Sequence, residues 1–113
     1  MQNSDNKNII LTGFMGTGKT TVGKLLAKKL KREFIDTDQL IENRQGLTIP
    51  EIFSDLGEPA FRQMEADIAR ELGKREGLVI STGGRLMLDP VNVAALSRNS
   101  RVFCLVATPQ EIL

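Results

Sequence analysis

The chain is poor in aromatic residues and in cysteine: its 113 residues include no tryptophan or tyrosine, and Cys104 is the single cysteine. One cysteine excludes an internal disulfide and fits a reducing compartment, so we expect a cytoplasmic protein. No apolar run approaches the roughly 20 residues of a membrane-spanning helix, and we expect no membrane partner. Residues 1–7 are polar, without the apolar core of a secretory signal, and are expected to be a flexible lead-in.

The chain also lacks an excess of charge of either sign. Fifteen basic residues against fourteen acidic ones leave a net charge of +1, so no overall field favours nucleic acid as a partner. Any anion site must therefore be local. A hydrophobic content of 41% with 26% charged residues is ordinary for a globular protein, and residues 8–113 are expected to form one domain.

A phosphate-binding loop pattern is the strongest motif. Residues 13–20 read Gly-Phe-Met-Gly-Thr-Gly-Lys-Thr, between an apolar strand-like run at 8–12 and a helical stretch. The glycines let backbone N–H groups point inward, Lys19 can reach the outer phosphates of a nucleotide, and the Thr20 hydroxyl can ligate Mg²⁺. The alternative without function is a glycine-rich turn between strand and helix, with a solvated lysine. The nucleotide-binding candidates are Gly13, Gly16, Thr17, Gly18, Lys19, Thr20 and Thr21.

Short apolar strands alternate with helices along the rest of the chain. Strands are predicted at 8–12, 32–35, 78–82 and 101–107; helices follow the loop, begin near Leu40, Thr48 and Glu58, and resume after Asp89. This alternation predicts an α/β fold, a parallel sheet with helices on both faces. Ligands bind such sheets at the carboxyl ends of the strands, so the loop, residues 36–38 and residues 82–85 should converge on one crevice.

The polar residues at these strand ends also have simpler explanations. Asp36 and Asp38 could close a strand and cap the next helix, and Arg62 could form an ordinary i,i+4 ion pair with Glu58. Gly83 and Gly84 could be a plain turn.

Five segments together resemble the shikimate kinase family. They are the loop at 13–20, Phe-Ile-Asp-Thr-Asp at 34–38, Thr-Ile-Pro-Glu-Ile-Phe at 48–53, Gly-Glu-Pro-Ala-Phe-Arg at 57–62 with Glu65, and Ser-Thr-Gly-Gly at 81–84. The resemblance implies transfer of the terminal phosphoryl group of ATP to the 3-hydroxyl of shikimate, in aromatic amino-acid biosynthesis. It also implies a P-loop, nucleoside-monophosphate-kinase-like fold with strand order 2-3-1-4-5, and a monomeric full-length enzyme.

The resemblance assigns roles to individual residues. Lys19 and Asp38 would be catalytic, the lysine neutralising phosphoryl charge and the aspartate binding the substrate hydroxyls and acting as base. Thr20 and Asp36 would hold Mg²⁺, Asp36 through its water shell. The implied shikimate-binding residues are Asp38, Arg62, Gly83 and Gly84, with Arg62 on the carboxylate.

Arg85 departs from the family, whose pattern has a third glycine at this position. If that glycine needs a left-handed backbone or lies against the substrate, arginine would cost about 1–3 kcal/mol and intrude on the pocket. We therefore expect Arg85 to impair substrate binding and activity. The alternative is an added cation near the substrate carboxylate.

The second departure is at the end of the chain. Residues 108–111 form a capping box with Pro109 in the first turn, yet the sequence stops at Leu113. We expect a chain cut within its domain, with four of the family's five strands and without the lid and C-terminal part; a structured short tail is the alternative. Such a chain is expected to have little kinase activity and to self-associate through the strand at 101–107.

Two other functions stay open. A gluconate or nucleotide kinase of similar fold is one, although a chain without tryptophan and tyrosine offers little for stacking a nucleobase. A nucleotide-binding remnant without catalysis is the other, supported by Arg85 and the early end.

Overall fold

The computed structural model describes residues 6–13, 19–83 and 85–105. Four strands and five α-helices alternate along these ranges, with a short 3₁₀ helix before the last α-helix. The elements are β1 (Asn8–Gly13), α1 (Lys19–Leu30), β2 (Glu33–Asp36), α2 (Thr37–Gln45), α3 (Ile49–Leu56), α4 (Glu58–Gly73), β3 (Leu78–Ser81), η1 (Leu86–Leu88), α5 (Pro90–Ser97) and β4 (Ser100–Leu105). None of the helices in these ranges combines the length and apolar character needed to span a bilayer.

The strands form one parallel sheet in the order β2-β3-β1-β4. β1 pairs with β3 through Ile10 and Ile80 and with β4 through Ile10 and Val102, while β2 pairs with β3 through Ile35 and Ile80. The predicted parallel α/β sheet is therefore confirmed, and the order agrees with the first four strands of the order that the family resemblance implied. All four strands end at the same edge of the sheet.

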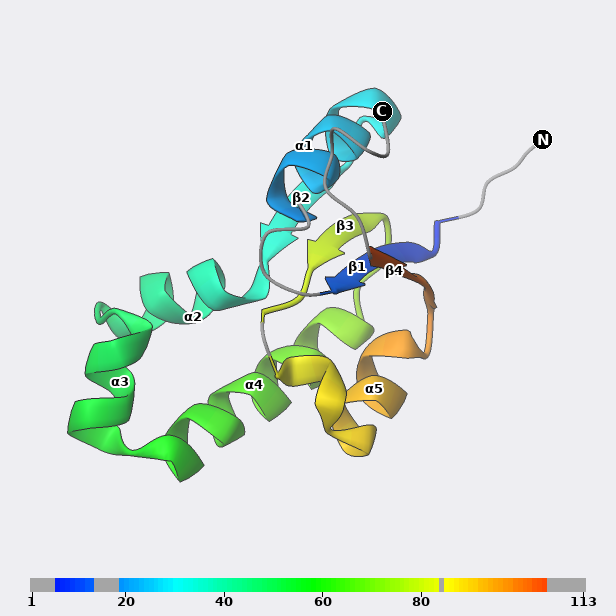
Figure 1. Cartoon of the computed structure of the whole chain (residues 1–113). Coiled ribbons are helices and arrows are strands. Elements are labelled where there is room, and N and C mark those ends of the chain that lie inside the picture. Colours follow the sequence, from blue (N-terminus) through cyan, green and yellow to red (C-terminus); the bar gives the residue numbers. More distant parts are fainter. Residues whose placement is uncertain (1–5, 14–18, 84, 106–113) are drawn as a thin grey trace.

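Helices cover both faces of the sheet, as the buried strands require (Figure 1). Alternate residues of β3 point to opposite sides: Ile80 belongs to the larger core cluster, which includes Ile68 and Leu72 of α4, whereas Val79 packs with Ala27 of α1. Figure 1 shows α1 above the sheet, α4 and α5 below it, and α2 and α3 extending to one side. The residues that line the cavity described below come from α2, α3, the first half of α4 and the segment after β3.

The predicted helix starts are mostly confirmed. Thr48 and Glu51 form the expected capping box of α3, and Asp89 caps α5 by accepting a hydrogen bond from the Val91 amide. One boundary was wrong: α2 begins at Thr37, directly after β2, and not near Leu40. The helix starts early because Asp36 is its N-cap and satisfies backbone amides of the first turn. The helix predicted at Pro109 lies outside the described residues.

Candidate functional site

Lys19 bridges two strand ends. It is the first residue of α1, and its Nζ donates hydrogen bonds to the carbonyl oxygens of Gly13, at the end of β1, and Thr82, just after β3, at 2.9 and 3.0 Å. The ammonium group therefore lies at the sheet edge where the phosphates of a nucleotide are expected. Gly16, Thr17 and Gly18 of the predicted loop lie outside the described residues, and Thr21 is exposed in the first turn of α1.

Asp36 both caps a helix and faces the start of α1. Its Oδ1 accepts hydrogen bonds from the amides of Asp38 and Gln39, and its Oδ2 lies 3.5 Å from the Thr20 hydroxyl. The helix-cap explanation considered for Asp36 is therefore confirmed through Oδ1, and the metal-binding role stays a prediction that concerns Oδ2. Fixing Oδ1 on the helix start leaves Oδ2 directed toward Thr20.

The pair of oxygens from Thr20 and Asp36 has the chemistry that Mg²⁺ prefers, a hydroxyl and a carboxylate. Within the described residues there is no group of three or more acidic, histidine or cysteine side chains that could hold a metal. An ion at this place would therefore take its remaining ligands from phosphate oxygens and water, as Mg²⁺ commonly does.

Asp38 lies in the first turn of α2, against the backbone of Gly83. The Gly83 amide donates a 2.8 Å hydrogen bond to Thr37 Oγ1, which ties the residue after β3 to the start of α2. A Cβ on Gly83 would lie only 1.9 Å from Asp38 Oδ1, so only glycine leaves room for this carboxylate. The structure thus shows a close approach of the Gly83 backbone to Asp38, whereas the expected contact with substrate stays a prediction; Gly84 lies outside the described residues.

The Asp38 carboxyl is poised to exchange a proton near neutral pH. Burial, the main cause, and the nearby carboxylates of Asp36 and Glu65 raise its pKa to about 6, against the opposing charge of Lys19. A group with such a pKa is charged at pH 7.5 and still basic enough to accept a proton.

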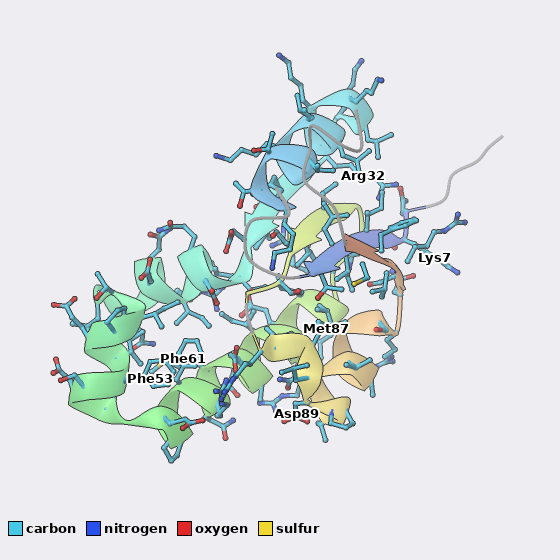
Figure 2. All side chains as sticks on the ribbon, viewed as in Figure 1. Lys7, Arg32, Phe53, Phe61, Met87 and Asp89 are labelled. Carbon is cyan, nitrogen blue, oxygen red and sulfur yellow. The ribbon has the colours of Figure 1, made fainter. Side chains whose placement is uncertain are left out.

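A cavity of about 410 Å³ opens beside Asp38. Phe53 of α3 and Phe61 of α4 face each other across the gap between their helices, with ring centroids 5.0 Å apart (Figure 2). The cavity therefore combines an apolar wall with charged groups. Its lining residues are Asp38, Ile49, Phe53, Glu58, Phe61, Arg62, Glu65 and Arg85.

Arg62 presents its guanidinium to this cavity between two carboxylates. Its Nη1 donates a 2.7 Å hydrogen bond to Glu65, and its Nε and Nη2 donate to Glu58 Oε2 at 3.3 and 3.1 Å. The ordinary i,i+4 pair with Glu58 is thus real, but it lies in the cavity that also contains Asp38. The sequence-predicted candidates Asp38 and Arg62 are brought to one cavity. Lys19 does not line it, but its charge acts on Asp38.

Glu65 is a site residue to which we gave no role from the sequence. Its side chain is only 2% exposed and pairs with Arg62. Burial raises the pKa of its carboxyl, while the hydrogen bond from Arg62 lowers it. The signal was available, because Glu65 falls on the apolar face of α4 together with Phe61, Ile68 and Leu72, where an acidic residue needs a buried partner.

The backbone at Arg85 does not have the conformation that would have made an arginine costly. Its φ is −116° and its ψ 1°, outside the left-handed region, so the expected strain is absent. The side chain is largely exposed and lines the cavity. The condition for backbone strain is therefore not met, and impairment through intrusion on the pocket stays a prediction.

Comparisons with known proteins point to one family. A family model described as Shikimate kinase matches residues 15–113. The chain is 53% identical over 106 residues to a shikimate kinase of Pelotomaculum thermopropionicum, a match that covers 94% of this chain and 62% of that protein. A shikimate kinase of Thermus thermophilus is 48% identical over 105 residues, covering 93% of this chain and 57% of that protein. The chain thus spans less than two thirds of the length of these relatives.

Solved structures agree with the fold. Shikimate kinase from Acinetobacter baumannii in complex with shikimate superposes with a TM-score of 0.84 at 45% identity, covering 95% of this chain and 59% of that one. The enzyme from Aquifex aeolicus gives 0.81 at 36% identity, covering 93% and 62%. A gluconokinase from Sinorhizobium meliloti gives 0.55 at 18% identity, covering 97% and 63%, and shares the fold alone. With the strand order, the lysine at the strand ends and a match over nearly its whole length, this chain belongs to the shikimate kinase family.

Proposed function

We propose that the active site of this protein transfers the terminal phosphoryl group of ATP to the 3-hydroxyl of shikimate. The observation that carries the proposal is the cavity beside the strand ends, where Asp38 and Arg62 lie together and the charge of Lys19 acts on Asp38. Asp38 suits a hydroxyl and Arg62 suits a carboxylate, so the cavity complements an acidic ring alcohol. Membership of the family supports this choice of substrate.

Lys19 binds the outer phosphates in this proposal. Its two present partners are backbone carbonyls, which carry only partial charge, so phosphate oxygens can replace them and gain a charge-assisted contact. The amides of residues 13 and 16–18 and the hydroxyls of Thr20 and Thr21 complete the nucleotide site. Lys19 then neutralises the charge on the phosphoryl oxygens during transfer.

Asp38 orients the attacking hydroxyl and accepts its proton. The hydroxyl oxygen forms a bond to the terminal phosphorus while the bond from that phosphorus to the bridging oxygen of ADP breaks, and the hydroxyl proton passes to the Asp38 carboxylate. The raised pKa, about 6, makes this carboxylate a better base than an ordinary aspartate. Gly83 keeps the space in which the carboxylate lies. Gly84 is proposed to bind substrate on the strength of the family resemblance alone.

Thr20 and Asp36 are the residues proposed to hold Mg²⁺ with ATP. The ion, when bound, supplies positive charge to the phosphate oxygens. The carboxylate of Asp36 is suited to this because the helix start fixes its other oxygen. Removing that carboxylate by Asp36→Ala should therefore weaken Mg²⁺-dependent ATP binding and also loosen the first turn of α2.

The test is calorimetric titration of the chain with shikimate, gluconate and AMP, each with and without ATP and Mg²⁺, followed by mass detection of the phosphorylated product after long incubation. We expect shikimate to bind, its affinity to rise with nucleotide, and shikimate phosphate to form. Asp38→Asn should keep nucleotide binding and abolish product. Preferential phosphorylation of gluconate or AMP would overturn the proposal in favour of another small-molecule kinase. Nucleotide binding with no response to shikimate would favour a non-catalytic remnant.

A further inference from the structure

Arg85 adds a second guanidinium to the cavity. It follows the end of β3, lines the same cavity as Arg62, and its side chain is 66% exposed. Its backbone lies outside the left-handed region, so the position does not require glycine on conformational grounds. The arginine is thus accommodated without backbone strain, and its charge can act in the cavity.

One carboxylate oxygen lies between the two guanidinium groups. Oε2 of Glu58 accepts hydrogen bonds from Nε and Nη2 of Arg62 and lies 3.7 Å from Nη1 of Arg85. Glu58 is the first residue of α4 and its side chain is 56% exposed, so it can turn toward solvent at little cost. The place it occupies is one where a carboxylate is held by two arginines at once.

Arg62 keeps a partner when Glu58 leaves. Its Nη1 is bound to the buried Glu65, which fixes the guanidinium plane from within the protein. The Nε and Nη2 edge is then available for a bidentate contact with a carboxylate, the geometry that suits arginine best. Glu65 therefore acts as the permanent partner and Glu58 as the exchangeable one.

The positive charge of Arg85 offsets the carboxylates that line the cavity. Three carboxylates, those of Asp38, Glu58 and Glu65, line the cavity against the guanidinium groups of Arg62 and Arg85. With Arg62 as the sole cation on these walls, an anionic substrate would meet a strongly negative surface. The charge of Arg85 reaches across the cavity, since it also lowers the pKa of Glu65.

We propose that Arg85 is a specificity-determining residue that binds the substrate carboxylate together with the Nε and Nη2 edge of Arg62. Glu58 holds the two guanidiniums in place as an internal substitute for that carboxylate and is displaced by it. This inference rests on the proposed function, because it takes an acceptor alcohol that carries a carboxylate. It reverses the expectation that arginine at this position impairs the site.

The test compares shikimate with its methyl ester, which keeps the hydroxyls and lacks the negative charge. Both are titrated calorimetrically into the unsubstituted chain, Arg85→Gln, Arg85→Lys and Arg85→Gly. We expect Arg85→Gln and Arg85→Gly to weaken shikimate about fivefold, the scale of one partly exposed charged contact, with no change for the ester. Arg85→Lys should retain part of the affinity. Arg70→Gln is the matched control: it removes one positive charge from an exposed pair with Asp67 on α4, outside the cavity lining, and should change neither ligand.

Glu58→Gln gives a second test, in which shikimate affinity is expected to change in the opposite direction from Arg85→Gln. Removing the competing carboxylate should tighten shikimate binding and leave the ester unchanged, whereas loss of a merely structural contact would weaken both. Equal or tighter shikimate binding by Arg85→Gln, or equal losses for shikimate and ester, would overturn the role of Arg85 and leave the proposed function standing. No shikimate binding by the unsubstituted chain would overturn the proposed function and this inference with it.

Discussion

The Asp38 carboxylate occupies the space that any side chain on Gly83 would need: a Cβ there would lie 1.9 Å from Oδ1 and 2.1 Å from Cγ. The two residues come from different strand ends, Asp38 from the helix after β2 and Gly83 from the segment after β3. The hydrogen bond from the Gly83 amide to Thr37 Oγ1 ties these two segments together, and the absence of a side chain on Gly83 leaves room for the candidate base.

Gly83→Ala should displace the Asp38 carboxylate and reduce shikimate affinity and turnover by about tenfold or more, because an ångström of misplacement suffices for such losses. Gly46→Ala is the control. Gly46 has φ +67°, and an alanine methyl there would meet no atom of a residue distant in the chain within 4 Å, so alanine introduces backbone strain of about 1 kcal/mol without crowding. Calorimetry with shikimate should separate the two variants; equal affinities would contradict the role given to the Gly83 contact.

The pH dependence of phosphorylation should follow Asp38. Because its pKa is about 6 and the carboxylate form is the base, the rate should fall about tenfold for each unit of pH below this value and level off above it. Glu65→Gln removes one of the charges that raise this pKa, so the acid limb should move to lower pH. An acid limb near pH 4, the range of an unperturbed aspartate, would contradict the assignment.

The same pKa makes Asp38 costly to fold in its charged form. The folded state holds the proton more tightly than the unfolded chain, so the contribution of this group to stability is greatest below the unfolded pKa of about 4 and is lost as the pH rises through about 6. Asp38→Asn should therefore stabilise the chain at pH 8 by about 1 kcal/mol, after allowance for solvent screening of a half-buried group, and have little effect at pH 4. Thermal unfolding at the two pH values measures the difference.

The convergence of the strand ends was predictable because parallel strands finish at one edge whatever their lengths, and three of the four strands were followed by glycine or polar residues. The roles of single side chains were less predictable. The sequence could not show that Asp36 divides its two oxygens between a helix cap and Thr20, since that depends on where α1 lies. The φ of Arg85 follows from the path between β3 and η1, which the pattern of glycines does not specify. The burial of Glu65, in contrast, could be predicted, because the helical spacing places it on the apolar face of α4.

The Arg62–Glu65 pair should matter for stability as well as for binding. Arg62→Ala leaves the buried Glu65 without its cation and should cost about 1–3 kcal/mol at pH 8. Loss of Arg62 removes the contact that lowers the pKa of Glu65, so the folded pKa rises further, and the cost should shrink as the pH falls and Glu65 takes up a proton.

The double variant Arg62→Ala with Glu65→Gln tests this directly, because it removes the charge that needs a partner. It should recover part of the stability lost in Arg62→Ala, measured by urea unfolding. If the two single effects simply add, the residues are not coupled and the pair has no special role.

Asn8 should be the polar residue on which the sheet depends most outside the site. Its side chain is fully buried at the start of β1, where Nδ2 donates to the carbonyls of Leu72 and Arg75 and Oδ1 accepts from the Leu78 amide. One amide group thus ties the end of α4 and the start of β3 to β1. Asn8→Ala leaves these buried backbone groups without hydrogen-bond partners and should lower the free energy of unfolding by about 2–3 kcal/mol. Asn43→Ala, which removes an exposed contact with Gln39, should cost only a few tenths of a kcal/mol by urea unfolding.

Because Asn8 lies at the opposite end of β1 from Lys19, nucleotide affinity of the folded Asn8→Ala chain should be unchanged. A parallel loss of affinity would show that the start of the sheet also supports the site.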